Sequence, residues 1–259
     1  MPAAAALPSL FFFVCAVPAV ILLGLSKGGF TGMSILSVPL LTLAIPPVEA
    51  AAVMLPILIV QDVVSVWSFR HEWDARNLVT MIPGSLIGVG IGWLFAAHLS
   101  EAAVMILVGM IALGFVTLAL WRHWRGRAQA TAKPGAASGV FWGAAAGFTS
   151  FVCHQGAPPF QVQVMPQNLP PRIFAGTATM FFAITNWAKL LPYIILGQLN
   201  FTSLKTSFTL FPLAIAATFA GVWLVRRVDG ERFYGLIYAL TLVVGLVLIG
   251  QGLHDLRIV

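Results

Sequence analysis

The sequence predicts an all-α polytopic membrane protein made of two inverted repeats. Hydrophobic residues make up 59% of the 259-residue chain and charged residues only 8%, and the mean hydropathy is +0.95. Several uncharged apolar stretches are long enough to cross about 30 Å of hydrocarbon. The second half of the chain also repeats landmarks of the first half in the same order. We therefore expect about ten helical segments, divided equally between two halves.

The repeat is read from pairs of residues that stand 127 positions apart. The aligned pairs are Lys27 with His154, Gly29 with Gly156, Pro39 with Pro166, and Asp62 with Lys189. Later landmarks follow at offsets of 129 to 130, among them Pro83 with Pro212 and Glu101 with Glu231. Each match alone is weak, but the constant order favours an internal duplication.

Each repeat is predicted to hold a broken, re-entrant hairpin followed by three transmembrane helices. The first repeat, 1–127, has its hairpin at 7–45 and spans at 50–69, 78–97 and 102–121. The second repeat, 128–259, has its hairpin at 135–167 and spans at 173–197, 207–225 and 233–253. The return arms, 33–45 and 159–167, are too short to cross a bilayer at about 1.5 Å per residue.

Glycines at four-residue spacing indicate where spans pack closely. One stripe is Gly84, Gly88 and Gly92, and the other is Gly139, Gly143 and Gly147. Small residues at this spacing let two helix backbones approach each other inside a membrane.

Loop charges predict the orientation. The central loop, 122–134, contains three arginines and one lysine but no acidic residue, which places it in the cytoplasm. If each hairpin makes no net crossing, the Arg226, Arg227 and Arg232 loop is also cytoplasmic and both termini are periplasmic. Lys205 and Arg257 then lie on the side that the rule disfavours. The net charge of +6 therefore implies a membrane surface as partner, and no nucleic acid.

The stretch GLSKGGFTGM, residues 24–33, places a lysine among glycines between two apolar runs. A lone charge at the bilayer centre costs about 2.5–3.5 kcal/mol, so it needs a partner, water or a ligand. A helix that restarts after the break would direct free N–H groups toward the lysine. We predict an anion site formed by Lys27, Gly28, Gly29 and Thr31. The alternative is that Lys27 reaches the interface and the glycines only pack.

The matching stretch of the second half, SFVCHQGAPPFQVQ, contributes His154, Gln155 and Gly156 to the same predicted site. Gln161 and Gln163 would add amide donors. The alternative roles are a histidine satisfied within the core and ordinary hydrogen bonds between helices.

Asp62 and Lys189 each lie inside a span, and two interpretations stay open for them. They could form an ion pair that ties the halves together. Asp62 could instead carry a coupling proton, while Lys189 and Asn186 hold the charge of the substrate.

Enzyme and metal chemistry find little support. Cys15 and Cys153 lie inside apolar runs and have no metal-ligand spacing. The neighbouring residues Cys153 and His154 would point about 100° apart on a helix, which suits a catalytic dyad poorly. We expect no enzyme, metal or cofactor, and keep a membrane-embedded enzyme as a minor alternative. An anion channel would need continuous polar rings, whereas the sequence offers two local clusters.

Three stretches resemble the sulfite exporter TauE/SafE family of the toluene sulfonate uptake permease superfamily (TSUP). They are GLSKGGFTGMSILSVPLL, GFTSFVCHQGAPPFQVQVMPQNLPPRIFAGT and NWAKLLPYIILGQ, and the resemblance covers nearly the full chain. It implies a transporter of sulfite, thiosulfate or an organosulfonate such as sulfoacetate in the bacterial inner membrane, often as an exporter. We expect a small anionic substrate, protons as coupling ion, and a monomer or homodimer. The second break, CHQGAPP, is less glycine-rich than the family pattern.

Overall fold

The structure is a computed structural model that describes residues 10–45, 47–95, 100–124, 135–195 and 201–256, and every regular element in these ranges is helical. The first half contains α1 (Leu10–Lys27), the 3₁₀ turn η1 (Met33–Leu36), α2 (Ser37–Thr42), α3 (Pro47–Ser68), α4 (Ala75–Phe95) and α5 (Glu101–Trp124). The second half contains α6 (Ala136–Cys153), α7 (Ala157–Val164), η2 (Met165–Gln167), α8 (Pro171–Ile195), α9 (Phe201–Val225) and α10 (Gly230–Asp255).

Each segment expected from the sequence has a helix at its place, with ends that differ by a few residues. Pro47 and Pro171 begin α3 and α8, because proline suits a first turn that has no use for its missing N–H. Asp229 caps α10 by accepting a hydrogen bond from the Arg232 backbone. The return arms are short helices, η1 with α2 and α7 with η2, and the all-helical fold class is confirmed.

The chain is a multi-pass membrane protein. Among the described residues, six helices are long and apolar enough to span a bilayer: α1, α4, α5, α6, α9 and α10. Large apolar side chains such as Leu94, Val79 and Phe208 are more than two-thirds exposed on the outside of the bundle, where lipid would cover them. Buried polar residues gather instead on α3 and α8, which contact each other.

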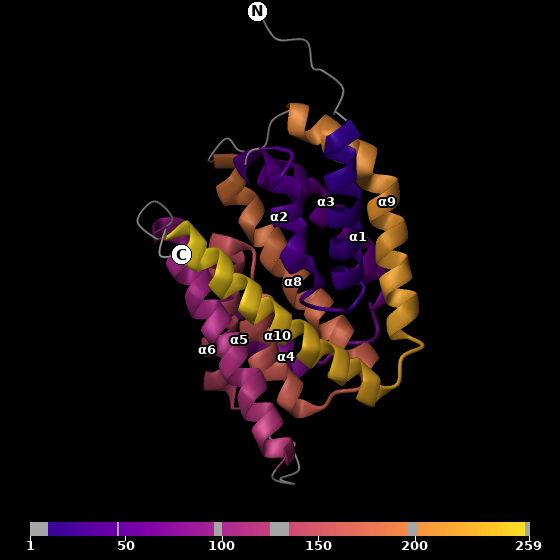
Figure 1. Cartoon of the computed structure of the whole chain (residues 1–259). Coiled ribbons are helices and arrows are strands. Elements are labelled where there is room, and N and C mark those ends of the chain that lie inside the picture. Colours follow the sequence, from indigo (N-terminus) through magenta and orange to yellow (C-terminus); the bar gives the residue numbers. More distant parts are fainter. Residues whose placement is uncertain (1–9, 46, 96–99, 125–134, 196–200, 257–259) are drawn as a thin grey trace, which may run out of the picture.

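The helix contacts repeat when the two halves are exchanged. Helix α1 packs along α9, and its counterpart α6 packs along α4, the counterpart of α9. In the same way α3 contacts α9 and α8 contacts α4, while α3 with α8 and α5 with α10 each pair a helix with its own counterpart, so that all of these contacts join the two halves. Figure 1 shows α1 beside α9, and α10 crossing in front of the bundle. The division at residue 127 and the opposite orientation of the repeats stay predictions.

The glycine stripes lie where α4 and α6 touch. A Cβ atom on Gly84 or Gly88 would collide with the carbonyl oxygen of Val140 or Ala144 on α6. Likewise, a Cβ atom on Gly143 would collide with the Met81 carbonyl oxygen on α4. The close packing predicted for each glycine stripe is confirmed, and the structure shows that the two stripes pack against each other.

The two breaks use different residues to reverse the chain. After α1, Gly29 and Gly32 have φ angles of 128° and 110°, a region that side chains with a Cβ rarely enter. After α6, the non-glycine His154 takes the left-handed conformation at φ 55°, and the Gln155 N–H bonds to the Thr149 carbonyl oxygen. Pro158 and Pro159 then begin α7.

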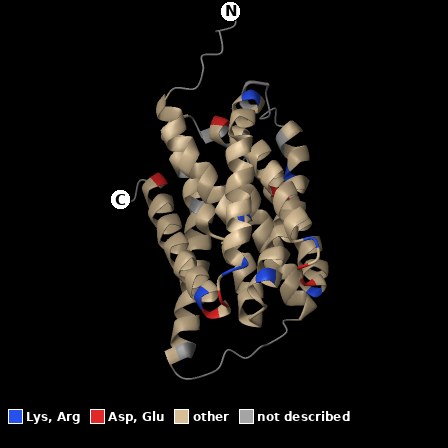
Figure 2. Ribbon diagram, turned by 90° about the vertical axis from the view of Figure 1, so that its right-hand side faces the viewer, with Lys and Arg blue, Asp and Glu red and all other residues tan. Residues whose placement is uncertain are grey.

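Most charged residues lie toward one end of the bundle (Figure 2). There Glu72, in the loop between α3 and α4, lies 3.4 Å from the Arg226 guanidinium and 4.0 Å from that of Arg172. Arg226 also donates to the Ser68 carbonyl oxygen. These contacts tie the α3–α4 loop to α8 and α9, although each exposed pair contributes little alone.

The close approach of α4 and α6 generates a stability prediction. Gly88→Ala should lower the unfolding free energy by about 1–3 kcal/mol, because the added methyl group overpacks the contact with α6. The matched control is Gly90→Ala on the same helix, where nothing lies within 4 Å of the added atom. Thermal unfolding of the purified proteins in one detergent checks both. A Gly88→Ala variant as stable as Gly90→Ala would contradict the prediction.

Candidate functional site

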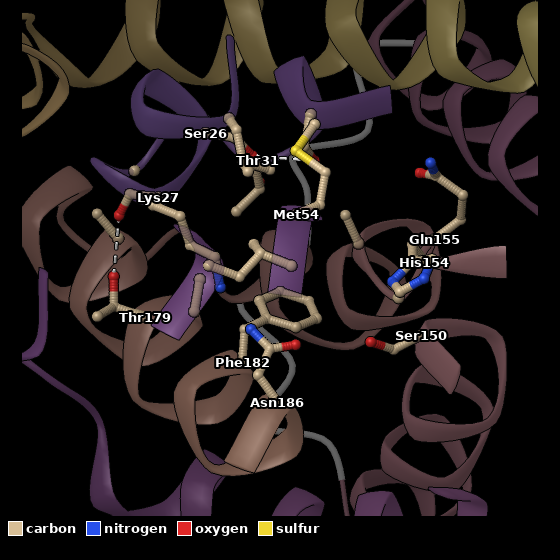
Figure 3. A pocket seen from close by; sticks show the side chains of 18 of the residues that line it. Ser26, Lys27, Thr31, Met54, Ser150, His154, Gln155, Thr179, Phe182 and Asn186 are labelled. Atoms are coloured by element: carbon tan, nitrogen blue, oxygen red, sulfur yellow. Dashed lines mark hydrogen bonds between the residues drawn. The ribbon is translucent and has the colours of Figure 1, made fainter. Parts of the chain in front are cut away.

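One pocket lies between the two breaks and is lined from both halves of the chain. Its empty space is about 850 Å³, the open space at its mouth included. The walls come from the end of α1, the first break, the middle of α3, the end of α6, the second break and α8. Figure 3 shows Lys27 and Thr179 on one side of the space and Ser150, His154 and Gln155 on the other.

Eight of the twelve residues proposed from the sequence line this pocket: Lys27, Gly29, Thr31, His154, Gln155, Gly156, Asn186 and Lys189. The structure thus brings the two breaks together around one space, with side chains of α8 between them. Their role in binding remains a prediction.

Lys27, the last residue of α1, forms an ion pair with Asp62 of α3. The Asp62 side chain is fully buried, and its second oxygen accepts a hydrogen bond of 2.8 Å from the Asn186 amide. Thr179 donates to the Lys27 carbonyl oxygen over 3.3 Å. Asp62 therefore lies behind the pocket wall and holds two residues that line it.

Lys189 has no such partner. Its ammonium group is buried and donates to the carbonyl oxygen and the hydroxyl of Ser150, at 3.1 and 3.0 Å. Among the described residues no carboxylate pairs with it. The sequence left open an ion pair between Asp62 and Lys189. That interpretation is wrong, because Asp62 pairs with Lys27.

The comparisons with known proteins can now be set beside this geometry. The family model for the sulfite exporter TauE/SafE matches residues 16–248. The chain belongs to the TauE/SafE family. The family is part of the TSUP superfamily, and no match is found among curated proteins or solved structures.

Four proposed site residues of this TauE/SafE protein lie outside the pocket lining. Gly28 packs against Gly221 of α9, where a Cβ atom would collide with backbone. Asp62 lies behind the wall, as described. Gln161 donates to Thr31 and accepts from the Thr241 hydroxyl, and Gln163 accepts from the Ser138 hydroxyl over 2.7 Å. The two glutamines make the hydrogen bonds between helices that the sequence left as an alternative.

The pocket also contains residues that the sequence reasoning missed, chiefly Ser26, Ser34, Met54, Ser150, Thr179 and Phe182. Ser150 stands four residues before His154 on the end of α6, so helical spacing could have found it. Met54 and Phe182 carry no polar signal and enter the pocket only through the packing of α3 and α8.

Nothing in the described part of the chain gathers three metal-ligating side chains. Cys153 is buried, and its thiol donates to the Thr149 carbonyl oxygen of its own helix. The first turn of α7 contains two prolines without N–H groups. The site therefore depends on side chains more than on helix ends.

The buried ion pair generates a second prediction. Asp62→Leu should cost about 3–5 kcal/mol of stability, because it leaves the Lys27 charge without its partner. The double variant Lys27→Met with Asp62→Leu should recover most of that loss. Glu72→Gln, which removes a half-exposed carboxylate, serves as control and should cost less than about 1 kcal/mol. Unfolding temperatures in one detergent check this, and equal values for the single and double variants would contradict it.

Proposed function

We propose that this TauE/SafE protein is a secondary transporter of a small sulfur-containing anion. The candidate substrates are sulfite, thiosulfate and organosulfonates such as sulfoacetate, exported across the bacterial inner membrane. The observation that carries the proposal is a pocket shared by the two chain breaks and lined by two lysines, one of which pairs with the Asp62 carboxylate behind the pocket wall. The transporter family to which the chain belongs supports the same class of function.

The charges around the pocket suit an anion. Lys27 and Lys189 line it, and Asp62 balances one of them. A cation without a counter-charge is costly in a membrane interior unless water or a ligand meets it. Serine, threonine, asparagine and glutamine side chains around the space offer further donors to the oxygens of an anion.

Alternating access follows from the two-part lining. The pocket lies between elements of both halves, so a change in how the halves pack would open it to one side and then to the other. The cluster of Glu72, Arg172 and Arg226 joins the halves at the arginine-rich end. The positive-inside rule assigns this end to the cytoplasm and both termini to the periplasm.

Asp62 is the candidate carrier of a coupling proton. It is the carboxylate that contacts both Lys27 and Asn186. Protonation would release Lys27 from its ion pair and so link the charge state of Asp62 to the charge that the pocket presents. An anion channel would dispense with this exchange, and an enzyme would require a nucleophile that Cys153, bonded within its own helix, does not supply.

Flux through proteoliposomes tests the proposal. The wild-type protein should carry sulfite or a sulfonate with saturable kinetics, and Lys27→Ala should abolish that flux while the protein remains folded by size-exclusion chromatography. Lys205→Ala, which changes an exposed lysine on α9, is the matched control and should transport like wild type.

Two outcomes would contradict the proposal. Unchanged flux in Lys27→Ala would remove this residue from the site. Single-channel conductance in planar bilayers would show a pore instead of a carrier.

A further inference from the structure

We propose that the pocket takes a singly charged organic anion, with its anionic group at Lys189 and Ser150 and its apolar part between Met54 and Phe182. This inference rests on the proposed function, but it replaces the doubly charged candidates, thiosulfate and sulfoacetate, by an organic anion with one negative charge and one orientation. It moves the anionic group of the substrate away from Lys27, the residue that the sequence marks most strongly.

Of the two lysines that line the pocket, Lys189 is the one without a carboxylate partner in the described part of the chain. The residue is 1% exposed, and two N–H groups of its ammonium group donate to the carbonyl oxygen and the hydroxyl of Ser150. An ammonium group has three donors, so one is left for a ligand. No carboxylate in the described ranges pairs with this nitrogen. A buried cation in this state is completed by an anion bound beside it.

Gln155 provides a second, independent sign of a ligand at the same end. It lines the pocket and is only 6% exposed, yet within the described ranges its side-chain amide forms no hydrogen bond. Buried amides in proteins normally have partners. In Figure 3, Gln155 lies on the same side as Ser150 and His154. Figure 3 shows the amide turned away from Ser150, so a change of the Gln155 rotamer would let its N–H₂ group donate to an oxygen of an anion held by Lys189.

The charge of the ligand follows from the three charged side chains at the pocket. Asp62 offsets Lys27 through their ion pair, whereas Lys189 stays unmatched. With His154 neutral, the site therefore carries one net positive charge. A monoanion brings the buried charge to zero, while a dianion leaves one negative charge in a medium that solvates it poorly.

The apolar residues that line the pocket favour a ligand with an apolar part. Leu23, Met54, Leu58, Ala175, Ala178 and Phe182 line the pocket together with the polar residues. Met54 and Phe182 lie between Lys27 and the Ser150 side in Figure 3. An inorganic ion held by Lys189 would leave these surfaces without a partner, whereas a short alkyl group would cover them and gain the free energy of apolar burial.

Isothermal titration calorimetry on the purified full chain in detergent tests which ligand charge the pocket prefers. Ethanesulfonate and sulfoacetate share a two-carbon skeleton but carry one and two negative charges. Ethanesulfonate should bind more tightly by roughly tenfold or more, and more tightly than methanesulfonate, which has a smaller apolar group. Propionate in the same series distinguishes a carboxylate group from a sulfonate group at Lys189.

Variants of pocket residues test where the anionic group and the apolar part of the ligand bind. Lys189→Met should lose ethanesulfonate binding, while the exposed-lysine control Lys205→Met keeps it. Asp62→Asn raises the net charge of the site to two, so the preference should shift toward sulfoacetate. Leu58→Phe should weaken ethanesulfonate more than methanesulfonate, because it fills the apolar end. Leu58→Phe, which changes no charge, keeps the test open if one of the charge variants fails to fold.

Equal or tighter binding of sulfoacetate by the wild-type protein would overturn the inference, as would unchanged ethanesulfonate binding in Lys189→Met. Either result leaves anion transport itself intact. Failure of every anion in the series, sulfite and thiosulfate included, to bind or to be transported would instead overturn the proposed function.

Discussion

A charge buried in an apolar interior has to be matched, and this constraint organises the centre of the protein. Asp62 receives Lys27 from the end of one helix and Asn186 from another, so a single carboxylate fixes two pocket residues. Lys189 meets the same constraint through Ser150 and leaves one donor open. Residues of the breaks after α1 and α6 line the pocket beside these groups.

The helices around this centre pack closely against one another. The contacts run in a series from α1 to α9, α3, α8, α4 and α6, with the polar pair α3 and α8 in the middle. At both ends of the series glycines allow backbone contact, between Gly28 and Gly221 and between Gly88 and α6. Glycine at these contacts lets the helix backbones approach closely. The pocket thus lies between two closely packed helix pairs.

The sequence predicts the fold more fully than the site. Apolar length predicts the helices, and the glycine stripes predict that α4 and α6 each pack closely against a neighbour, because these features are local or periodic. The repeat also brings attention to Lys27 and His154, which line one pocket. The partner of Asp62 could not be read in this way. It depends on how α1 and α3 are rotated against each other, and alignment of the halves suggests Lys189 instead.

The same limit explains why the sequence did not predict the hydrogen-bond partners of two glutamines or the apolar residues that line the pocket. Gln161 and Gln163 satisfy their amides with Thr31, Thr241 and Ser138, residues far from them in sequence. Nothing in the local pattern distinguishes such a partner from a ligand. Met54 and Phe182 look like any other core residue until α3 and α8 are placed, so an apolar lining is invisible before the tertiary structure is known.

The two breaks, after α1 and after α6, differ in the flexibility of their backbones. The first contains Gly28, Gly29 and Gly32, so its backbone has many accessible conformations. The second is braced by Pro158 and Pro159, whose rings restrict rotation. A change of backbone angles therefore costs less free energy in the first break than in the second. A rearrangement of the helices around the pocket should therefore change the backbone angles of the first break more than those of the second.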